Sequence, residues 1–127
     1  MRLLLDTQAL LWFLVDHPAL TATAKAAIED SNNEIFSSGV SAWEIATKHR
    51  SGKLPLADAF AANLSEVILG RFVELPITVR HGQLAGQLPD HHRDPFDRML
   101  IAQALEEKLV LISNERLFDA YGVGRLW

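Results

Sequence analysis

Four short apolar runs, separated by segments with helical periodicity, constrain the fold of this chain more than any other feature. They are typical of buried β-strands and lie at residues 2–5, 34–38, 71–76 and 109–113. Helices are expected at residues 8–15, 22–30, 41–50, 57–69, 78–86, 95–107 and 115–120. Alternating strands and helices predict an α/β fold with a central parallel sheet of about four or five strands, covered on both faces. Residues 124–127 are a candidate edge strand.

Composition narrows the class of protein. The 127 residues suffice for one domain with a substantial core, and no repeat or linker divides them, so we expect a single domain over 1–127. The absence of cysteine excludes a disulfide framework and suits the cytoplasm. The apolar run ALLWFLV is too short to span a bilayer, so we expect no membrane partner. A net charge of −4 argues against a non-specific nucleic-acid coat but is compatible with an enzyme that acts on nucleic acid.

The segment HHRDPFDRMLIAQA, residues 91–104, carries the signals of a helix start. Asp94 is the expected N-cap, since its carboxylate can accept free backbone N–H groups of the first turn, and Pro95 suits the first helical position. Asp97 falls on the same side of the helix as Leu100 and therefore points toward the body of the protein. Such a carboxylate needs a partner, so Asp97 is either a first-turn acid stabilised by the helix dipole or a functional group.

Other acidic residues stand where strands end and helices begin, the edge at which parallel sheets bind ligands. Asp6 follows the first strand, Glu44 lies in the first turn of the third helix, and Glu115 follows the fourth strand. Structural alternatives exist for two of them. Ser41 and Glu44 have the spacing of a capping box, and Glu115 is also explained as an exposed first-turn acid. Thr7 is the expected N-cap of the first helix.

Together with Asp97, these acids are expected to converge at one edge of the sheet, where their charges repel. Two carboxylates about 5 Å apart cost roughly 3 kcal/mol at an effective dielectric constant of about 20. Such a cluster takes up protons or recruits a cation, and without cysteine or an obvious histidine pair the fitting cation is Mg²⁺ or Mn²⁺. The residues therefore favour a metal-dependent phosphoryl-transfer site.

Four segments in sequence resemble the PIN-domain ribonucleases, and in particular the VapC-type toxins of bacterial toxin–antitoxin pairs: LLDT, SAWEIA, HHRDPFDRMLIAQA and LVLISNERLFDAYGV. The resemblance covers nearly the whole chain and implies a three-layer α/β/α PIN-like domain. It implies an endoribonuclease dependent on Mg²⁺ or Mn²⁺, which cuts RNA with metal-activated water and inhibits translation. It also implies a cognate antitoxin that holds the enzyme in check, and a homodimer.

The resemblance carries over to particular acids. Asp6 in LLDT, Glu44 in SAWE and Asp97 in DPFDRML match three metal-binding acids of the family. Glu115 stands where the family usually has a fourth acid, commonly Asp in a T-x-D pattern, whereas this chain reads S-N-E at 113–115. The Glu side chain is one methylene longer than that of Asp, so the chain departs from the family pattern at position 115. The polar residues expected around the four catalytic and metal-binding acids are Thr7, Asp94, Ser113 and Asn114.

Basic residues flank the acidic positions and are candidates for RNA contacts. Lys48 lies near the end of the third helix, and Arg93 and Arg98 lie beside the late acid pair. Flanking an acidic centre with bases would hold RNA phosphates on either side of the metal. The alternative is an ordinary solvated helix end, where bases also favour the negative C-terminal dipole. His91 and His92 are not expected to bind one metal, because adjacent residues seldom face the same ion.

Rival classes fit the residues less well. A receiver-like regulatory domain would carry an acidic pair near the first strand and a late Lys, but Asp6 is solitary and Asn114 follows the fourth strand. A dehalogenase-like phosphatase would carry D-x-D where this chain has D-T-Q. The serious alternative is a catalytically degenerate PIN domain that only binds protein or RNA. Metal-dependent turnover distinguishes it from the enzyme.

Overall fold

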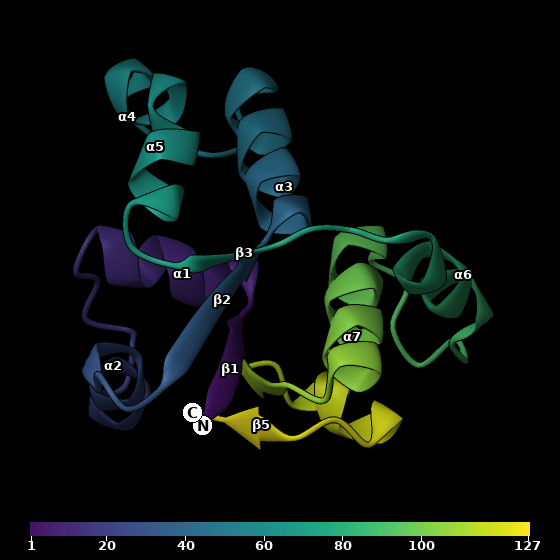
Figure 1. The fold of residues 1–127 in the computed structure, drawn as a ribbon. Helices are drawn as coiled ribbons and strands as arrows, with labels where there is room; N and C mark the ends of the chain where they lie inside the picture. The colour runs from purple at the N-terminus through teal and green to yellow at the C-terminus, as the bar shows by residue number, and fades with distance from the viewer.

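The computed structural model describes residues 1–127 and contains a sheet of five parallel strands (Figure 1). The strands are β1 (Arg2–Leu5), β2 (Glu34–Ser38), β3 (Val73–Leu75), β4 (Val110–Ile112) and β5 (Arg125–Leu126). The helices are α1 (Thr7–Leu14), α2 (Ala22–Glu29), α3 (Gly39–Arg50), α4 (Asp58–Ala62), α5 (Leu64–Leu69), α6 (Val79–Gln87), α7 (Pro95–Glu107) and the 3₁₀ helix η1 (Arg116–Tyr121). The predicted parallel α/β fold is confirmed, and the candidate edge strand near the end of the sequence does pair with β4.

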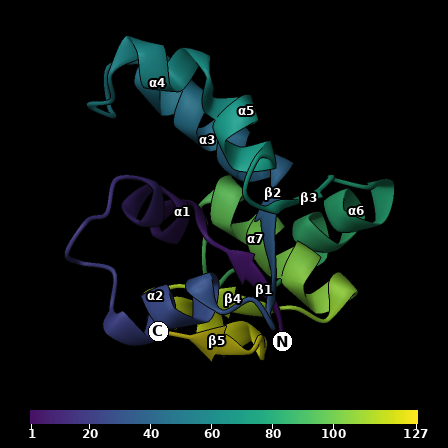
Figure 2. The same cartoon turned by 60° about the vertical axis from the view of Figure 1, so that its left-hand side comes forward.

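Two cores, one on each face of the sheet, give the three layers. The strand order β3-β2-β1-β4-β5 places β1 at the centre, and its side chains alternate between the faces. Leu3 and Leu5 join a core built with α1, α2, α3 and α5, whereas Leu4 joins a core built with α6, α7 and η1. Figures 1 and 2 show the same division, with α1 and α2 on one side of the sheet and α6 and α7 on the other.

Several element boundaries differ from the sequence prediction for local reasons. The helix expected over 57–69 is two helices, because Asn63 leaves the helical conformation (φ −107°, ψ 16°) and its side-chain amide donates to the carbonyl of Ala59 (2.8 Å). The third helix begins at Gly39, two residues earlier than predicted. The segment after β4 forms a 3₁₀ helix rather than an α-helix.

The carboxyl ends of β1, β2 and β4 lie at one edge of the sheet, because the strands are parallel and in register. Leu4 pairs with Phe36 on one side and with Leu111 on the other. This edge is where α1 and α3 begin (Figure 1), while the chain starts at the opposite end of β1. No helix combines the length and the apolar composition that a membrane-spanning segment requires.

Candidate active site

Asp6 connects the central strand to the first helix. Its backbone N–H continues the sheet by donating to the carbonyl of Ile112 (3.1 Å), and its carboxylate Oδ1 accepts from the backbone N–H of Ala9 (2.7 Å). Asp6 is therefore the N-cap of α1, and the expectation that Thr7 caps this helix is wrong. The Thr7 hydroxyl instead donates to the Ser41 hydroxyl (3.0 Å), which ties the start of α1 to α3.

Glu44 is carried into the site by α3. The N-cap of this helix is Ser38, whose hydroxyl accepts from the N–H of Val40 (3.0 Å), so the capping box considered as the alternative role of Ser41 and Glu44 is not formed. Glu44 lies in the second turn and is buried. One of its oxygens, Oε2, accepts from the ammonium group of Lys48 (2.5 Å), and the other, Oε1, is buried with no partner. A buried carboxylate oxygen without a donor is costly, so it calls for a cation or a donor in the cleft.

Asp97 is fixed at the start of α7 by the cap before it. The prediction for Asp94 is confirmed: its Oδ1 accepts from the N–H groups of Phe96 (2.8 Å) and Asp97 (3.1 Å). The Asp97 carboxylate accepts from Nε2 of His92 (2.8 Å). Nδ1 of His92 accepts from the N–H of Asp94 (3.3 Å), so the hydrogen of the neutral ring is on Nε2. His92 thus orients Asp97, a role that the sequence did not predict.

Glu115 follows β4 and caps η1. Its Oε1 accepts from the N–H of Leu117 (3.0 Å), and its own N–H donates to the Ser113 hydroxyl (3.0 Å). Glu115 is exposed, in contrast to the buried Asp6 and Glu44. The alternative of an exposed acid therefore holds, although Glu115 is the N-cap of η1 and not a first-turn residue, and its side chain also borders the cleft described next.

One cleft, with a volume of about 310 Å³, brings the acids together. The predicted site residues that line it are Asp6, Thr7, Glu44, Lys48, Asp94, Asp97, Asn114 and Glu115. Ser113, Arg93 and Arg98 do not line it. The lining residues that sequence reasoning missed are Gln8, Leu11, Trp12, Ile45 and Leu54. The periodicity of α1 places Leu11 and Trp12 one turn beyond Thr7 and Gln8, which was the available signal for their position.

Burial and mutual repulsion make two of the acids reluctant to ionise. The pKa of Asp6 is raised from 3.8 to about 6, mainly by burial and further by Asp97 and Glu44, against hydrogen bonds from the Ser113 hydroxyl and the Ala9 N–H. The pKa of Asp97 is also raised to about 6, first by burial and then by Asp94 and Glu44, while His92 opposes the shift. At neutral pH both groups are mostly ionised at a cost in free energy, which a bound cation would remove.

The side chains of the cleft fit an oxygen-binding divalent cation in their chemistry, but not as a preformed cage. Carboxylates surround the cleft and one buried oxygen has no partner, which suits Mg²⁺ or Mn²⁺. However, no group of three or more His, Asp or Glu side chains is arranged so that it could hold a metal ion. Lys48 and His92 occupy oxygens of Glu44 and Asp97. Each contact uses one oxygen of its carboxylate, so Oε1 of Glu44 and Oδ1 of Asp97 are the oxygens that a cation would meet.

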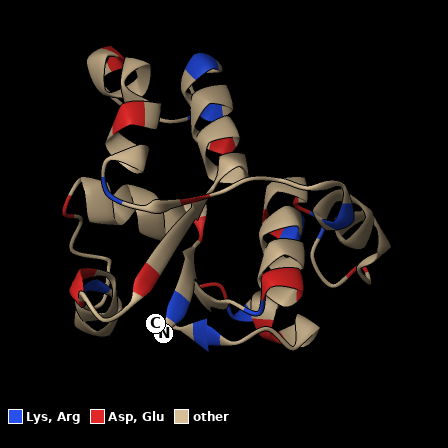
Figure 3. Cartoon of the chain, viewed as in Figure 1, with Lys and Arg blue, Asp and Glu red and all other residues tan.

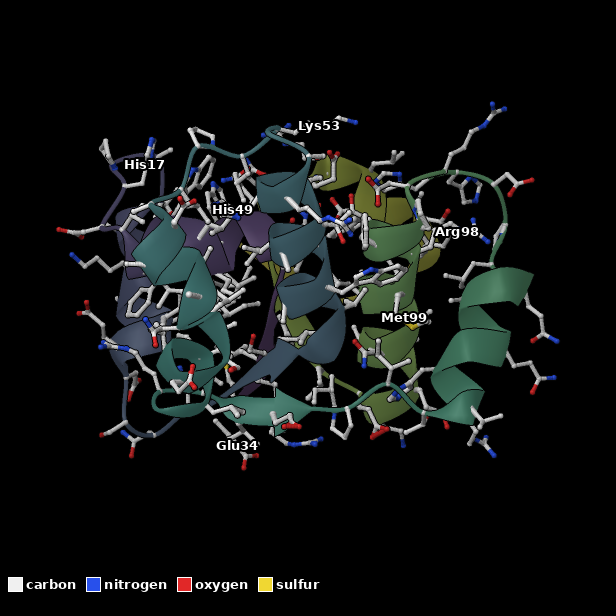
Figure 4. All side chains as sticks on the ribbon, turned by 90° about the horizontal axis from the view of Figure 1, so that it is seen from above. His17, Glu34, His49, Lys53, Arg98 and Met99 are labelled. Atoms are coloured by element: carbon white, nitrogen blue, oxygen red, sulfur yellow. The ribbon has the colours of Figure 1, made fainter.

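The basic candidates separate into different environments. Arg98 was predicted to contact RNA, but its guanidinium donates to four backbone carbonyls, those of Ala85, Leu88, Pro89 and His92, at 2.7–3.1 Å. Its side chain is only 14% exposed, so the structure corrects this prediction: Arg98 holds the segment between α6 and α7 in place (Figure 4). Arg93 is exposed, and Lys48 borders the cleft. The basic residues of α3 lie toward its C-terminal end (Figure 3).

Comparison with known proteins assigns the family. The model of the PIN domain family matches residues 3–124. Over 73 residues the chain is 37% identical to Ribonuclease VapC16 of Mycobacterium tuberculosis; this match covers 54% of the chain and 51% of the relative, so it spans about half the length of that protein.

Solved structures share the fold at low sequence identity. The crystal structure of VapBC2 from Rickettsia felis bound to a promoter DNA fragment matches with a TM-score of 0.75 and 16% identity, over 99% of this chain and 98% of that one. DNA-bound VapBC from Salmonella typhimurium matches with a TM-score of 0.74 and 17% identity, over 99% of this chain and 97% of that one. VapBC-1 from nontypeable Haemophilus influenzae matches with a TM-score of 0.73 and 14% identity, also over 99% of this chain and 97% of that one. The family match runs from the central strand through the acids at the sheet edge, and the chain therefore belongs to the PIN domain family.

Proposed function

We propose that this chain is a metal-dependent endoribonuclease, the VapC-type toxin of a toxin–antitoxin pair, formed by a single PIN domain. The observation that carries the proposal is the cleft in which carboxylates from four separate segments meet at the carboxyl edge of a parallel sheet. The 37% identity to Ribonuclease VapC16 over 73 residues supports RNA as the substrate. Catalysis would therefore reside in Asp6, Glu44, Asp97 and Glu115.

Divalent metal, Mg²⁺ or Mn²⁺, is the proposed cofactor. Asp6, Glu44, Asp97 and Glu115 would hold it, because they supply the hard oxygen ligands that these ions prefer. When bound there, the ion would activate water and neutralise charge on the scissile phosphate. The raised pKa values of Asp6 and Asp97 support this assignment, since a cation is the partner that lets both stay ionised at neutral pH.

Other residues of the chain would support the acids and bind the RNA backbone. His92 donates to Asp97 and fixes the direction of its carboxylate, and Asp94 holds the first turn of α7 that carries Asp97. Thr7 and Ser113 place hydroxyl groups among the strand ends, and Asn114 borders the cleft. Lys48, once released from Glu44, and the exposed Arg93 are the proposed phosphate contacts.

A cognate antitoxin protein and a second copy of this chain are the proposed partners. The antitoxin is supported by the solved structures with the same fold, which were determined as VapBC assemblies. The homodimer rests on the resemblance to VapC-type toxins. Inhibition of translation by RNA cleavage would take place in the cytoplasm, where the absence of cysteine suits a reducing environment.

The test is cleavage of purified total tRNA and rRNA by the isolated protein with Mg²⁺, with Mn²⁺ or with EDTA. Asp97→Asn removes the charge of one proposed ligand. Asp90→Asn is the matched control, since it makes the same change on a side chain that is 88% exposed and does not line the cleft. Discrete fragments that require metal, persist in Asp90→Asn and vanish in Asp97→Asn would support the enzyme. A folded, metal-binding protein that cleaves none of these RNAs would favour the degenerate binding module.

A further inference from the structure

The lining of the cleft has two kinds of side chain, and the proposed reaction uses only one of them. Besides the acids, the partly exposed apolar side chains of Trp12 and Leu54 line the cleft. Leu11 and Ile45 also line it and are almost fully buried. Phosphate hydrolysis requires polar and charged groups, so an apolar wall beside the acids has no role in it. Such a wall favours a ligand whose charged part is followed by a flat apolar part.

Trp12 is held in a fixed orientation. His17 stacks on its ring with the centroids 5.3 Å apart and an interplanar angle of 17°, and Trp127 packs against it at 5.9 Å and 46°. The ring also packs on the core under α1. These contacts restrict the indole before any ligand arrives, so binding against it would cost little side-chain entropy. His17 already covers one ring face, so a ligand would meet only the part of Trp12 that lines the cleft. Leu54 belongs to the connection after α3, next to the exposed Lys53, which lies at the same end of the molecule as His49 (Figure 4).

Two neutral amide side chains border the same cleft. Gln8 is exposed in the first turn of α1, and Asn114 is exposed after β4. Carboxamides carry both donors and an acceptor, and they pair with the edges of nucleobases. An apolar wall with amides on its border matches the way in which unpaired bases are bound: stacked on an aromatic residue and hydrogen-bonded at their edges.

We propose that the Trp12–Leu54 side of the cleft is a nucleobase subsite, which takes one unpaired base next to the phosphodiester that the acids cut, with Gln8 and Asn114 contacting its edge. The inference rests on the proposed ribonuclease function and deepens it. The consequence for the substrate is direct: a base stacked in a helix cannot enter the subsite, so the RNA is single-stranded at the cleavage point. Base stacking on an aromatic residue contributes about 1–3 kcal/mol per base.

Base binding can be measured without any cleavage. The indole N–H signal of Trp12 in a proton–nitrogen correlation spectrum, assigned by its loss in Trp12→Phe, is followed during titration with AMP or UMP in the presence of Mg²⁺. Ribose 5-phosphate is the matched probe that has the phosphate but no base. Trp43, which is 59% exposed on α3 and does not line the cleft, reports non-specific stacking. We expect both nucleotides to shift the Trp12 signal, ribose 5-phosphate to leave it in place, and Gln8→Ala to weaken the response.

Equal shifts of Trp12 and Trp43, or equal responses to nucleotide and ribose 5-phosphate, would overturn the subsite. A cleavage assay then links it to the reaction, using a single-stranded RNA with or without an abasic nucleotide at the cut. The wild-type rate should fall roughly tenfold on the abasic RNA, and Trp12→Leu should lose most of that discrimination. A base-specific shift without cleavage of any RNA would refute the nuclease and keep the subsite, whereas cleavage that ignores the base would refute the subsite alone.

Discussion

Replacing Asp6 with Asn should stabilise the metal-free protein near neutral pH, although it removes a proposed ligand. The Asn side chain keeps an oxygen that can accept from the N–H of Ala9, so the cap of α1 is preserved. What disappears is a buried negative charge that Asp97 and Glu44 repel. Most substitutions of buried polar residues destabilise a protein, so the sign of this change tests the electrostatic argument directly.

The size of the effect follows from the shift in the Asp6 pKa. A rise from 3.8 to about 6 corresponds to about 3 kcal/mol of unfavourable free energy in the ionised folded state. We therefore expect the substitution to raise the free energy of unfolding at neutral pH by about 1–3 kcal/mol. The folded state holds its proton more tightly than the unfolded state, so wild-type stability declines as the pH rises from 3.8 to about 6.

Urea unfolding in EDTA, at about pH 4 and about pH 7.5, measures this difference. Asp6→Asn should match the wild type at the lower pH, where Asp6 is protonated in the folded state, and exceed it at the higher pH. Asp58→Asn is the control, because that carboxylate is 98% exposed and its loss should change the free energy of unfolding by under about 0.5 kcal/mol. If Asp6→Asn were less stable than the wild type at both pH values, or gained the same stability at both, the ionised Asp6 carboxylate would not be destabilising the folded state.

Further predictions concern metal, the α6–α7 segment and the buried polar contacts. Mg²⁺ should raise the unfolding midpoint of the wild type but not of Asp97→Asn; equal shifts would place the ion elsewhere. Arg98→Lys should lower the free energy of unfolding by about 2–3 kcal/mol, because Lys cannot donate to four carbonyls, and should leave the salt dependence of RNA binding unchanged. If RNA binding by Arg98→Lys depended less steeply on salt concentration than binding by the wild type, Arg98 would be a phosphate contact after all. Gln103→Leu should cost about 1–3 kcal/mol in urea unfolding by removing the buried bond to the Ser38 hydroxyl (2.5 Å), and an unchanged midpoint would refute that.

The strands and helices along the chain and the edge at which the acids gather could be predicted from the sequence, because strand periodicity and strand ends are local signals. The start of α3 could not. The helix was expected to begin at Ser41, whereas Ser38 caps it, and the Ser38 hydroxyl donates to Gln103 of α7, a contact across 65 residues of sequence. The Arg98 role failed for the same reason. A basic residue beside an acidic centre looks solvated in the sequence, and only the fold brings the carbonyls between α6 and α7 around it.

The details of the cleft depend on contacts that are local in the sequence and on contacts that only the fold creates. Asp94 was correctly predicted as an N-cap because Asp followed by Pro is a local sequence signal of a helix start. The bond between His92 and Asp97 spans five residues and requires the turn before α7, so charge and spacing alone gave no sign of it. Sequence reasoning did not place Trp12 at the site. The structure adds that its ring also faces the cleft that holds the acids.

The four acids are held in two different ways, and this determines how the cleft would accept a cation. Asp6 and Glu115 each use one carboxylate oxygen to cap a helix, so the backbone fixes them in place. Glu44 and Asp97 cap nothing, and the side chains of Lys48 and His92 hold them instead. A divalent ion competes with such basic side chains far more easily than with backbone N–H groups of a helix start, because the side chains can rotate away. In the proposed enzyme, Asp6 and Glu115 are therefore the fixed side of the metal site. Glu44 and Asp97 are the adjustable side: Lys48 and His92 each hold one oxygen, and the other oxygen of each carboxylate, Oε1 of Glu44 and Oδ1 of Asp97, would face the cation.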